Sequence, residues 1–413
     1  MRVVADFHIH SRYSRATSPQ LDLDLLAQWG RYKGIHLLGT GDCTHPLWLS
    51  ELKQKLKISS GGFYEYQGIQ FLLTTEVNTH FVVGGKSRRI HNVLFVPSIP
   101  IAETLNQRLA RYGDLTSDGR PSLNLSARDL VKLCLEVSQE ILIVPAHVWT
   151  PHFSIFGANS GFDTVEECFG DQTKEIFCLE TGLSSDPAMN WRLSRLDRYT
   201  LISNSDSHSA TRIGREANVF ECVGPSYREI LEILKTKDPK RFLYTIEFFP
   251  EEGKYHFDGH RHCKARISPA ESAKHQNRCP VCGRKVTIGV MHRVEELADR
   301  PADYQPSKQI PFKRLVPLDQ ILSEARGVGV GSKAVEQEYL DLVKRVGTEF
   351  EILVDLSEEA LRKSLPPKVA EGILRVRAGQ IEILPGYDGE YGHVQIFEKG
   401  KEPAGEKQLT LFE

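Results

Sequence analysis

Two histidines, His8 and His10, stand one residue apart directly after a short apolar run at residues 3–7. Alternate residues of a strand face the same side, so both imidazoles would point together from the end of this strand. An unpaired buried polar group costs about 1–3 kcal/mol, and a metal ion would satisfy both rings. The alternative is a solvated pair at a strand end, which needs no ligand.

Residues of the kinds that bind metals also end later apolar runs, at residues 34–42, 68–76, 140–147 and 199–208. With the opening pair, the candidate ligands are His8, His10, Asp42, Glu76, His91, His147, Asp206 and His208. Imidazoles mixed with carboxylates suit Zn²⁺ or Mn²⁺ better than Mg²⁺, which prefers oxygen ligands. A carboxylate such as Glu76 would bridge two ions about 3.5–4 Å apart, the arrangement used in two-metal phosphoester hydrolysis.

The elements that must position these residues alternate regularly along residues 1–235. Apolar runs are separated by helical stretches, for example at residues 21–33 and 126–140. Strand–helix alternation with continuous apolar strands predicts a parallel α/β sheet or barrel. In a closed α/β barrel the strand ends gather at one face, where the candidate ligands would meet.

The whole chain has 413 residues, of which 40% are hydrophobic, and a net charge of −2. This length allows two or three domains, and the near-neutral charge does not by itself indicate a nucleic-acid partner. The sequence does not open with a basic and then apolar leader, and no apolar run is long enough to span a membrane. We therefore expect a cytoplasmic protein without membrane contact.

A basic stretch follows the predicted barrel. Residues 254–314 hold thirteen Lys or Arg against six Asp or Glu, which favours a polyanion site over an ordinary charged surface. The same stretch contains three of the eight cysteines, and the other five are scattered and expected to be reduced core residues.

The clustered cysteines are Cys263, Cys279 and Cys282. A Cys-x-x-Cys-Gly knuckle paired with a second half-site predicts one structural zinc ion, with a redox cysteine pair as the alternative. His260 is expected as the fourth ligand because its spacing to Cys263 repeats that of the knuckle, and His256 and His262 are the alternatives. Metal binding would supply much of the folding energy of so small a module.

From residue 317 onward the chain is predicted to be helical. The glycine pattern at residues 325–335 resembles the hairpin of a helix-hairpin-helix, whose backbone N–H groups bind DNA phosphate, although a flexible loop explains it equally well. The residues expected to contact DNA are Arg261, Arg284, Lys285, Gly329, Gly331 and Lys333. The tail, with Gln408, Leu411 and Phe412, resembles a bacterial sliding-clamp-binding pentapeptide, and a random amphipathic end is the alternative.

The barrel motifs together resemble the PHP (polymerase and histidinol phosphatase) family: HIH at residues 8–10, TGDCTH at 40–45, Glu76, HNVL at 91–94, AH at 146–147 and SDSH at 205–208. This resemblance implies a distorted seven-stranded β/α barrel that carries up to three metals, in a family whose members often hydrolyse phosphate esters. It implies one ion held by His8, His10, Glu76 and Asp206, a second held by Glu76, His91 and His147, and a contribution of Asp42 and His208 to a third. It also implies that the catalytic residues are Asp206, Glu76, His8, His10 and His147.

Two features depart from the PHP pattern. Residues 13–16 contain no third histidine, and the usual T-D-H is spread over residues 40–45. The ligands of a third ion therefore stay open: His45, His80 and His152 are alternatives for ligands or a general acid, and the other interpretation is that they are surface residues.

The order of a PHP barrel, a D-G-H-R-x-C…C-P-V-C-G module and a helical module resembles the endonuclease Q family over nearly the whole chain. The resemblance implies a nucleoid-associated DNA repair enzyme that cuts 5′ to uracil, hypoxanthine, xanthine or an abasic site and leaves a 3′-hydroxyl and a 5′-phosphate. It implies double- or single-stranded DNA and a sliding clamp as partners, and two or three ions of Zn²⁺, Mn²⁺ or Mg²⁺ in the barrel. The predicted parts are the barrel at 1–238, the zinc module at 239–311, a helical DNA-binding module at 312–400 and a flexible tail at 401–413.

Two other functions are compatible with some of these features. A small-molecule phosphatase of the histidinol-phosphate type would share the barrel ligands but would not need the zinc knuckle, the glycine hairpin or the tail. A zinc-dependent nucleic-acid-binding protein with a catalytically idle barrel would need those parts but not the ligand set.

Overall fold

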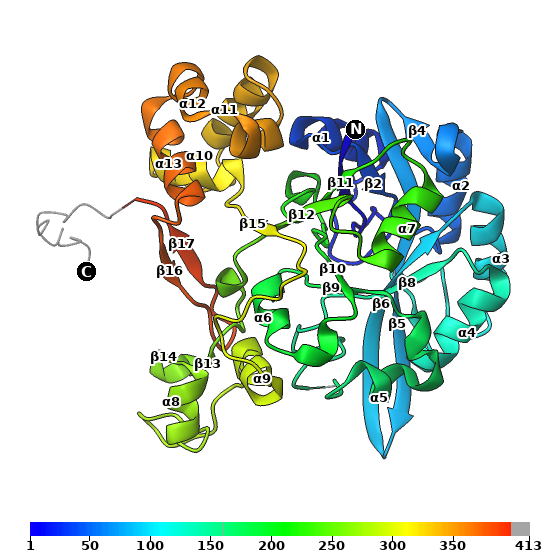
Figure 1. Ribbon diagram of the computed structural model, residues 1–413, viewed down its shortest axis with the longest axis horizontal. Coiled ribbons are helices and arrows are strands. Elements are labelled where there is room, and N and C mark those ends of the chain that lie inside the picture. Colours follow the sequence, from blue (N-terminus) through cyan, green and yellow to red (C-terminus); the bar gives the residue numbers. More distant parts are fainter. Residues whose placement is uncertain (160, 398–413) are drawn as a thin grey trace, which may run out of the picture.

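The computed structural model describes residues 1–159 and 161–397. Seven strands of its N-terminal part close into a barrel (Figure 1). In order around the barrel they are β1 (Arg2–Asp6), β2 (Leu37–Gly39), β5 (Ile69–Val83), β6 (Lys86–Val96), β8 (Leu142–Pro145), β9 (Cys178–Glu180) and β10 (Thr200–Ile202). The Val148 N–H donates to the Glu180 carbonyl at 3.0 Å between β8 and β9, and a bridge between Ile9 and Ser207 closes the ring. The predicted fold, a distorted α/β barrel, is confirmed.

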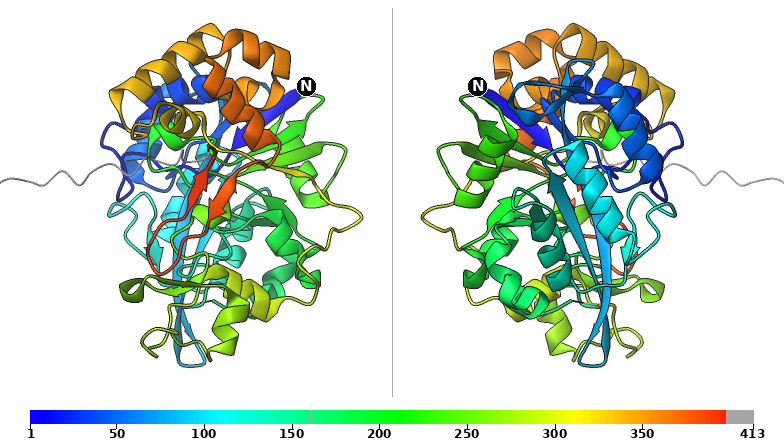
Figure 2. Two further views of the ribbon diagram at one scale, coloured as in Figure 1. Left: turned by 90° about the vertical axis from the view of Figure 1, so that its left-hand side faces the viewer. Right: turned by 90° about the vertical axis from the view of Figure 1, so that its right-hand side faces the viewer.

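The barrel is not wholly parallel, which corrects one expectation. β1–β2, β2–β5 and β9–β10 pair in parallel, but β6 pairs antiparallel with both β5 and β8. The reason is the turn between β5 and β6, where Gly84 and Gly85 have φ of 57° and 76°. Two residues in this conformation form a tight hairpin, and an apolar run cannot distinguish a hairpin strand from a crossover strand. The hairpin projects beyond the barrel (Figures 1 and 2).

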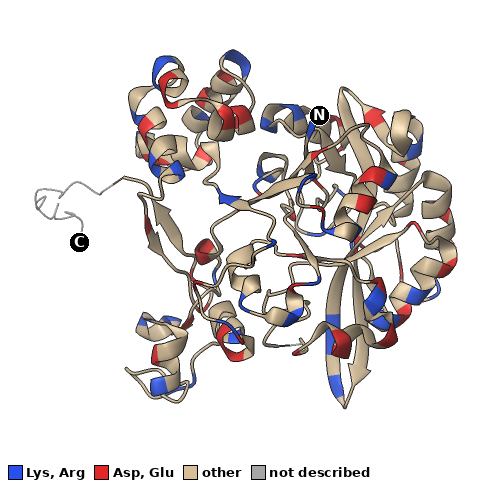
Figure 3. Cartoon of the chain, viewed as in Figure 1, with Lys and Arg blue, Asp and Glu red and all other residues tan. Residues whose placement is uncertain are grey.

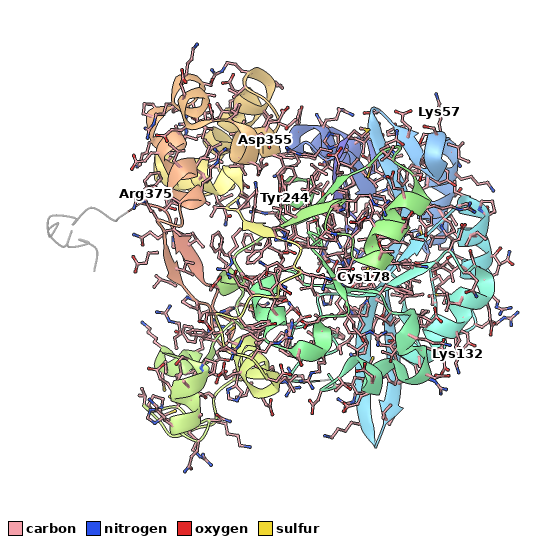
Figure 4. All side chains as sticks on the ribbon, in the orientation of Figure 1. Lys57, Lys132, Cys178, Tyr244, Asp355 and Arg375 are labelled. Atoms are coloured by element: carbon pink, nitrogen blue, oxygen red, sulfur yellow. The ribbon has the colours of Figure 1, made fainter. Side chains whose placement is uncertain are left out.

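Helices cover the outside of the barrel and apolar side chains fill it. The helices are α1 (Leu23–Lys33), α2 (Pro46–Lys55), α3 (Ile99–Leu109), α4 (Ala127–Val137), α5 (Val165–Phe169), α6 (Pro187–Trp191) and α7 (Tyr227–Thr236). Phe7, directly after β1, and Phe95 on β6 lie 4.9 Å apart between ring centroids, although β1 and β6 are not paired. Their apolar cluster, which includes Cys178 (Figure 4), therefore packs the barrel interior.

The sheet continues on the other side of β1 through β11 (Ala217–Glu221), β12 (Phe242–Glu247) and β15 (Phe312–Arg314). Three short strands complete it at the far edge and beside β5: β3 (Lys57–Ile58), β4 (Tyr64–Tyr66) and β7 (Ser122–Leu123). Between β12 and β15 lies the predicted zinc-binding module, called the zinc module below, with β13 (Asp258–His260), β14 (Ala265–Ile267), α8 (Pro269–Lys274) and α9 (Val290–Leu297). The barrel sheet thus runs past residue 238, and the chain returns to it after the zinc module.

The C-terminal part is helical, as predicted, and ends in a hairpin. Its helices are α10 (Leu318–Arg326), α11 (Lys333–Arg345), α12 (Glu358–Ser364) and α13 (Pro367–Arg377), followed by β16 (Glu382–Leu384) and β17 (His393–Gln395). An ion pair of 2.6 Å between Arg2 and Asp355 (Figure 4) ties this module to β1, and the buried pair Lys33–Glu349 ties it to α1 at 2.5 Å. None of the helices in the described ranges combines the length and the apolar character that a membrane span requires.

Candidate metal centre

The structure brings most of the predicted ligands together at one rim of the barrel. Two groups offer ligand atoms that lie within 4.8 Å of one another: His8, His10, Glu76 and Asp206 in the first, and Glu76, His91 and His147 in the second. The two oxygens of Glu76 serve different groups. Its Oε1 lies 2.5 Å from His91 Nδ1 and 3.1 Å from His147 Nε2, whereas its Oε2 lies 3.3 Å from His10 Nε2. This is the arrangement of a carboxylate that bridges two ions.

The donor atoms fit divalent metal ions. His8 Nε2 is buried and has no hydrogen-bond partner among the described residues, although it lies 3.5 Å from both Glu76 Oε2 and Asp206 Oδ1. A buried nitrogen without a partner is costly, and an ion held between it and two carboxylates removes that cost. Nitrogen and carboxylate donors in this proportion suit Zn²⁺ or Mn²⁺.

The charges at the rim favour a cation. Burial lowers the pKa of His8, but the carboxylates of Glu180 and Asp206 outweigh burial and raise it well above its usual value. Burial raises the pKa of Glu76, yet the neighbouring charges, led by His91, hold it well below the usual range. The carboxylates that raise the pKa of His8 attract a metal ion for the same reason, whereas burial lowers the pKa of His91 to about 4 and keeps that ring neutral, as a ligand must be.

Glu180 orients two of the ligands. It ends β9, lies 3.0 Å from His8 Nδ1 and accepts a hydrogen bond of 2.9 Å from the His147 backbone N–H. The Asn204 amide donates to the same carboxylate at 2.8 Å. With Nδ1–H donating to Glu180, His8 presents an unprotonated Nε2 to the rim, as a metal ligand must.

Asp42, which the sequence predicts as a ligand of a third ion, lies outside both groups. Its Oδ1 is 3.0 Å from His10 Nδ1, and its Oδ2 accepts hydrogen bonds from the Ser11 N–H, the Ser11 hydroxyl and the Ser14 hydroxyl at 2.7, 2.7 and 2.9 Å. It therefore holds His10 as Glu180 holds His8. A role of Asp42 as a ligand stays a prediction.

His208, also predicted for a third ion, lies beside His10 with ring centroids 4.4 Å apart and the ring planes tilted by 51°, and its Nδ1 lies 2.9 Å from the Asp206 carbonyl oxygen. The three alternatives form hydrogen bonds elsewhere: His45 with Thr116, His80 with Ser87 and His152 with Asn159. Among the residues that the structure describes, none of these four histidines belongs to either of the two ligand groups of the barrel.

The backbone is strained where the strands end at the rim. Asp42, His147 and Asp206 have φ of 48°, 32° and 46°, in the left-handed region that favours glycine. Each such residue costs on the order of 1–3 kcal/mol and persists only where its surroundings enforce it. The strained backbone of His147 packs against Gly182. A Cβ at position 182 would lie 2.5 Å from the His147 Cβ, so only glycine leaves room for the His147 side chain.

The cysteine module gathers a third group, made of His260, Cys263, Cys279 and Cys282. His260 Nδ1 lies 3.5 Å from Cys282 Sγ. The alternatives His256 and His262 are not part of this group, and burial lowers the pKa of His256 to about 4. Three thiols and one imidazole match a structural zinc site.

The residues predicted to contact DNA lie on the outer modules, where basic side chains are mixed with acidic ones (Figure 3). Arg284 and Lys285 are exposed beside the knuckle, whereas Arg261 pairs with Glu390 at 2.7 Å. The predicted hairpin, with Gly329, Gly331 and Lys333, is an exposed connection from α10 into the start of α11. The predicted clamp-binding residues Gln408, Leu411 and Phe412 lie outside the described residues.

A cavity of about 610 Å³ opens beside the two metal-binding groups. His91, His147 and Asp206 line it, together with Phe153 of the barrel. Its other walls come from the segment that leads into the zinc module and from the hairpin between β16 and β17, which contribute Lys254, Tyr255 and Tyr391.

Two solved structures of endonuclease Q have a similar fold over nearly the whole chain. The lesion-specific endonuclease PfuEndoQ from Pyrococcus furiosus superposes with a TM-score of 0.86 and 32% identity, over 96% of this chain and 95% of that one. An endonuclease Q bound to a 27-mer duplex with an abasic lesion at its active site gives a TM-score of 0.85 and 32% identity, over 98% and 100% of the two chains. The chain belongs to the endonuclease Q family.

Other relatives of this endonuclease Q family member carry no assigned function. The uncharacterized protein YqxK of Bacillus subtilis is 30% identical over 416 residues, which cover 95% of this chain and 99% of YqxK. The uncharacterized protein MJ0043 of Methanocaldococcus jannaschii is 33% identical over 252 residues, which cover 60% of this chain and 31% of MJ0043. A family model described as the MJ0043 C-terminal domain matches residues 317–380, which contain α10 to α13.

Sequence reasoning assigned no role to two residues of the centre in this endonuclease Q homologue. Glu180 ends an apolar run just as the predicted ligands do, so the same signal would have found it. Arg120 carries no such signal, because it lies in the loop before β7. Its Nη1 approaches Glu76 Oε2 to 3.2 Å, and burial keeps this pair partly from solvent.

Proposed function

We propose that the protein is a metal-dependent DNA repair endonuclease that hydrolyses the phosphodiester 5′ to uracil, hypoxanthine or xanthine and at abasic sites, leaving a 3′-hydroxyl and a 5′-phosphate. The observation that carries the proposal is Glu76, whose two oxygens join two ligand groups at one rim. Family membership over nearly the whole chain supports the substrate class.

The chain's own residues would prepare the centre as follows. Divalent ions held by His8, His10, Glu76, Asp206, His91 and His147 would supply Lewis-acid activation of water and of the scissile phosphate. Glu180 and Asp42 fix the histidine tautomers, since each accepts from an Nδ1. Arg120 places a fixed positive charge beside Glu76, where the charge of the phosphate would develop.

The cavity beside the centre is proposed to receive the damaged nucleotide. Enzymes that act at a single base extrude it from the helix, which costs least where pairing is already weakened. Phe153, Tyr255 and Tyr391 supply aromatic surface for stacking, and Lys254 lies within 6 Å of both tyrosine rings. The cavity of about 610 Å³ lies within the range usual for small-molecule sites.

The outer modules are proposed to bind the duplex around the lesion. Exposed Arg284 and Lys285 on the zinc module, and Lys333 with the open glycine connection before α11, are available for phosphate contacts. These contacts would add affinity without reading sequence.

A sliding clamp is the proposed protein partner. The proposal depends on Gln408, Leu411 and Phe412 in the C-terminal tail. Deleting residues 408–413 should abolish retention by an immobilised bacterial clamp while nicking of a short duplex stays within about twofold of wild type. Retention of the truncated protein at wild-type level would remove the tail from the clamp-binding hypothesis.

One experiment separates this proposal from its two rivals. The purified protein is incubated with Mn²⁺ or Zn²⁺ and an end-labelled duplex that carries one deoxyinosine, with the undamaged duplex as the control. A single nick 5′ to the lesion supports the proposal. Release of phosphate from small esters without nicking would indicate a small-molecule phosphatase, and binding without either reaction would indicate a nucleic-acid-binding protein.

A further inference from the structure

The hairpin of β5 and β6 carries two of the candidate ligands and then continues away from them. Glu76 is opposite Val93, and the next pairs on the same face are Asn78 with His91, His80 with Arg89 and Val82 with Ser87. Opposite residues of an antiparallel pair, and alternate residues along each strand, share a face. The face that holds Glu76 and His91 therefore extends outward through His80, Ser87, Arg89 and Val82, which we call the hairpin face.

The two faces of this hairpin differ in what covers them. On the back face, Phe81 packs against Phe162 with ring centroids 6.3 Å apart, and the Arg88 guanidinium lies 4.4 Å above the same ring. On the hairpin face, Ser87 and Arg89 are exposed, as is Val82, with 66% of its surface accessible. The back face is therefore braced against the barrel, whereas the hairpin face meets Phe153 beside His91 and Arg89 and is exposed farther out, at Val82 and Ser87.

Arg89 gives the hairpin face a positive charge. It lines the same cavity as His91 and Asp206, and within the described ranges no carboxylate lies within 4.0 Å of its guanidinium. Exposed Lys86 stands at the tip, next to the turn. Figure 3 shows basic positions along this hairpin, and Figure 1 shows that it projects at the same end of the molecule as the zinc module.

We propose that the hairpin face is a DNA-backbone-binding surface, which holds the substrate on one side of the cut while the zinc module holds it on the other. The inference rests on the proposed function and adds the path of the DNA. Val82 lies six positions beyond Glu76 on β5, or roughly 20 Å away at about 3.3 Å per residue. DNA rises about 3.4 Å per nucleotide, so the hairpin face reaches roughly six nucleotides from the scissile phosphate.

The braced geometry makes a backbone contact more suitable here than a flexible arm. A cation on a rigid strand is already in place when the phosphate arrives, so little ordering cost opposes the contact. The His80–Ser87 hydrogen bond of 2.9 Å fixes the two polar side chains between Arg89 and the tip. A protein partner is the other possible occupant, and it would leave DNA binding unaffected by changes in this face.

The test compares Arg89→Gln, Lys86→Gln and the charge-preserving Arg89→Lys with Lys57→Gln. Lys57 is an exposed cation on β3, at the end of the barrel opposite the hairpin tip (Figure 4). Fluorescence anisotropy measures Kd for a labelled duplex with one abasic site and long flanks at several salt concentrations. Circular dichroism melting verifies that each variant is folded.

Arg89→Gln should raise Kd about three- to tenfold and lower the slope of log Kd against log salt by about one, the value for one lost phosphate contact. Lys86→Gln should act in the same direction, Arg89→Lys should restore most of the affinity, and Lys57→Gln should match wild type. Wild-type affinity and slope in Arg89→Gln would overturn the proposal.

A second measurement locates the contact. Duplexes are trimmed to about two base pairs beyond the lesion on one side or the other, and the Arg89→Gln defect should disappear for one of the two. A defect that persists on both trimmed duplexes would place Arg89 at the lesion itself and overturn the hairpin path. Anisotropy requires no cleavage, so these results remain distinct from a failure of the wild-type protein to nick, which would refute the proposed function alone.

Discussion

The barrel centre and the cysteine module both gather metal ligands, but they do so in opposite ways. The barrel ligands span His8 to Asp206 and are mostly buried, whereas the module draws its four from His260 to Cys282, and most of those are at least partly exposed. The barrel donors are nitrogen and oxygen, and the module donors are mainly sulfur. A site assembled from distant strands needs a fold that already exists, whereas a site assembled from one short segment can create its fold.

The apolar cores support this contrast. Both ligand groups of the barrel rest on extensive apolar clusters that run through the barrel and its helices. Around the cysteines the buried apolar cluster consists of Ile267, Cys279 and Val286, and one of these three is itself a ligand, whereas Val290 and Val294 of α9 belong to the main cluster. We therefore expect the barrel ions to serve chemistry and the module ion to serve folding.

The largest expected effect comes from removing a barrel ligand without disturbing the barrel. Asp206→Asn should lower the rate of nicking about a thousandfold or more, because the amide cannot replace the charge that holds an ion at the rim. The melting temperature should stay within a few degrees of wild type, since Asp206 lies at the edge of the core. Asp303→Asn, at an exposed position of the link after α9, is the control and should nick normally. Nicking by Asp206→Asn at more than a tenth of the wild-type rate would exclude Asp206 from the centre.

Removing ligands of the zinc module should disturb the local fold first, whereas removing a barrel ligand should disturb the chemistry and leave the fold intact. Cys279→Ser combined with Cys282→Ser should unfold residues 260–286 locally, because the small apolar cluster around the cysteines cannot hold this segment without the ion. Limited proteolysis should then cut within this segment, while the barrel resists. DNA affinity should fall about tenfold through lost phosphate contacts. Unchanged affinity in a variant that has lost its zinc would separate the module from DNA binding.

A smaller effect should come from a residue that positions a ligand. Glu180→Gln should weaken metal binding about 10–100-fold, since the amide no longer fixes the His8 tautomer. Nicking should be lost at low metal concentration and recovered when the metal is raised, which distinguishes positioning from direct participation. Glu65→Gln, at a partly buried position within β4 and outside the ligand groups, provides the control. A defect that no metal concentration rescues would contradict the positioning role.

Most of the barrel could be predicted from the sequence because strand-end ligands and apolar runs are local patterns. His8, His10 and Glu76 were each recognisable from a strand end, and the structure brings them together. The antiparallel β5–β6 hairpin and Arg120 were not predictable in the same way. A strand's apolar pattern does not state the direction of its neighbour, and a loop arginine acquires its meaning only when the fold sets it beside Glu76.

The smallest expected effect is on stability. We expect the stability of the barrel and that of the zinc module to change with pH in opposite directions. Glu247 on β12 is fully buried, and burial raises its pKa to about 8 although the hydroxyls of Thr181 and Thr245 donate to it. Between an unfolded pKa of about 4.3 and the folded value, the folded protein holds a proton that the unfolded chain releases, so stability falls as pH rises through this window.

The zinc module should respond in the other direction, because its thiols must lose protons to bind metal and its stability falls as pH drops. Both proteins contain the same zinc module. Subtracting the melting temperature of wild type from that of Glu247→Gln therefore removes the module's contribution to the pH dependence. The difference should widen by a few degrees between pH 5.5 and pH 9, since only wild type must ionise a buried carboxyl at high pH. Glu382→Gln, at an exposed position of β16, should show no such trend. Parallel curves for Glu247→Gln and wild type would mean that this carboxyl is ionised in the folded barrel at neutral pH.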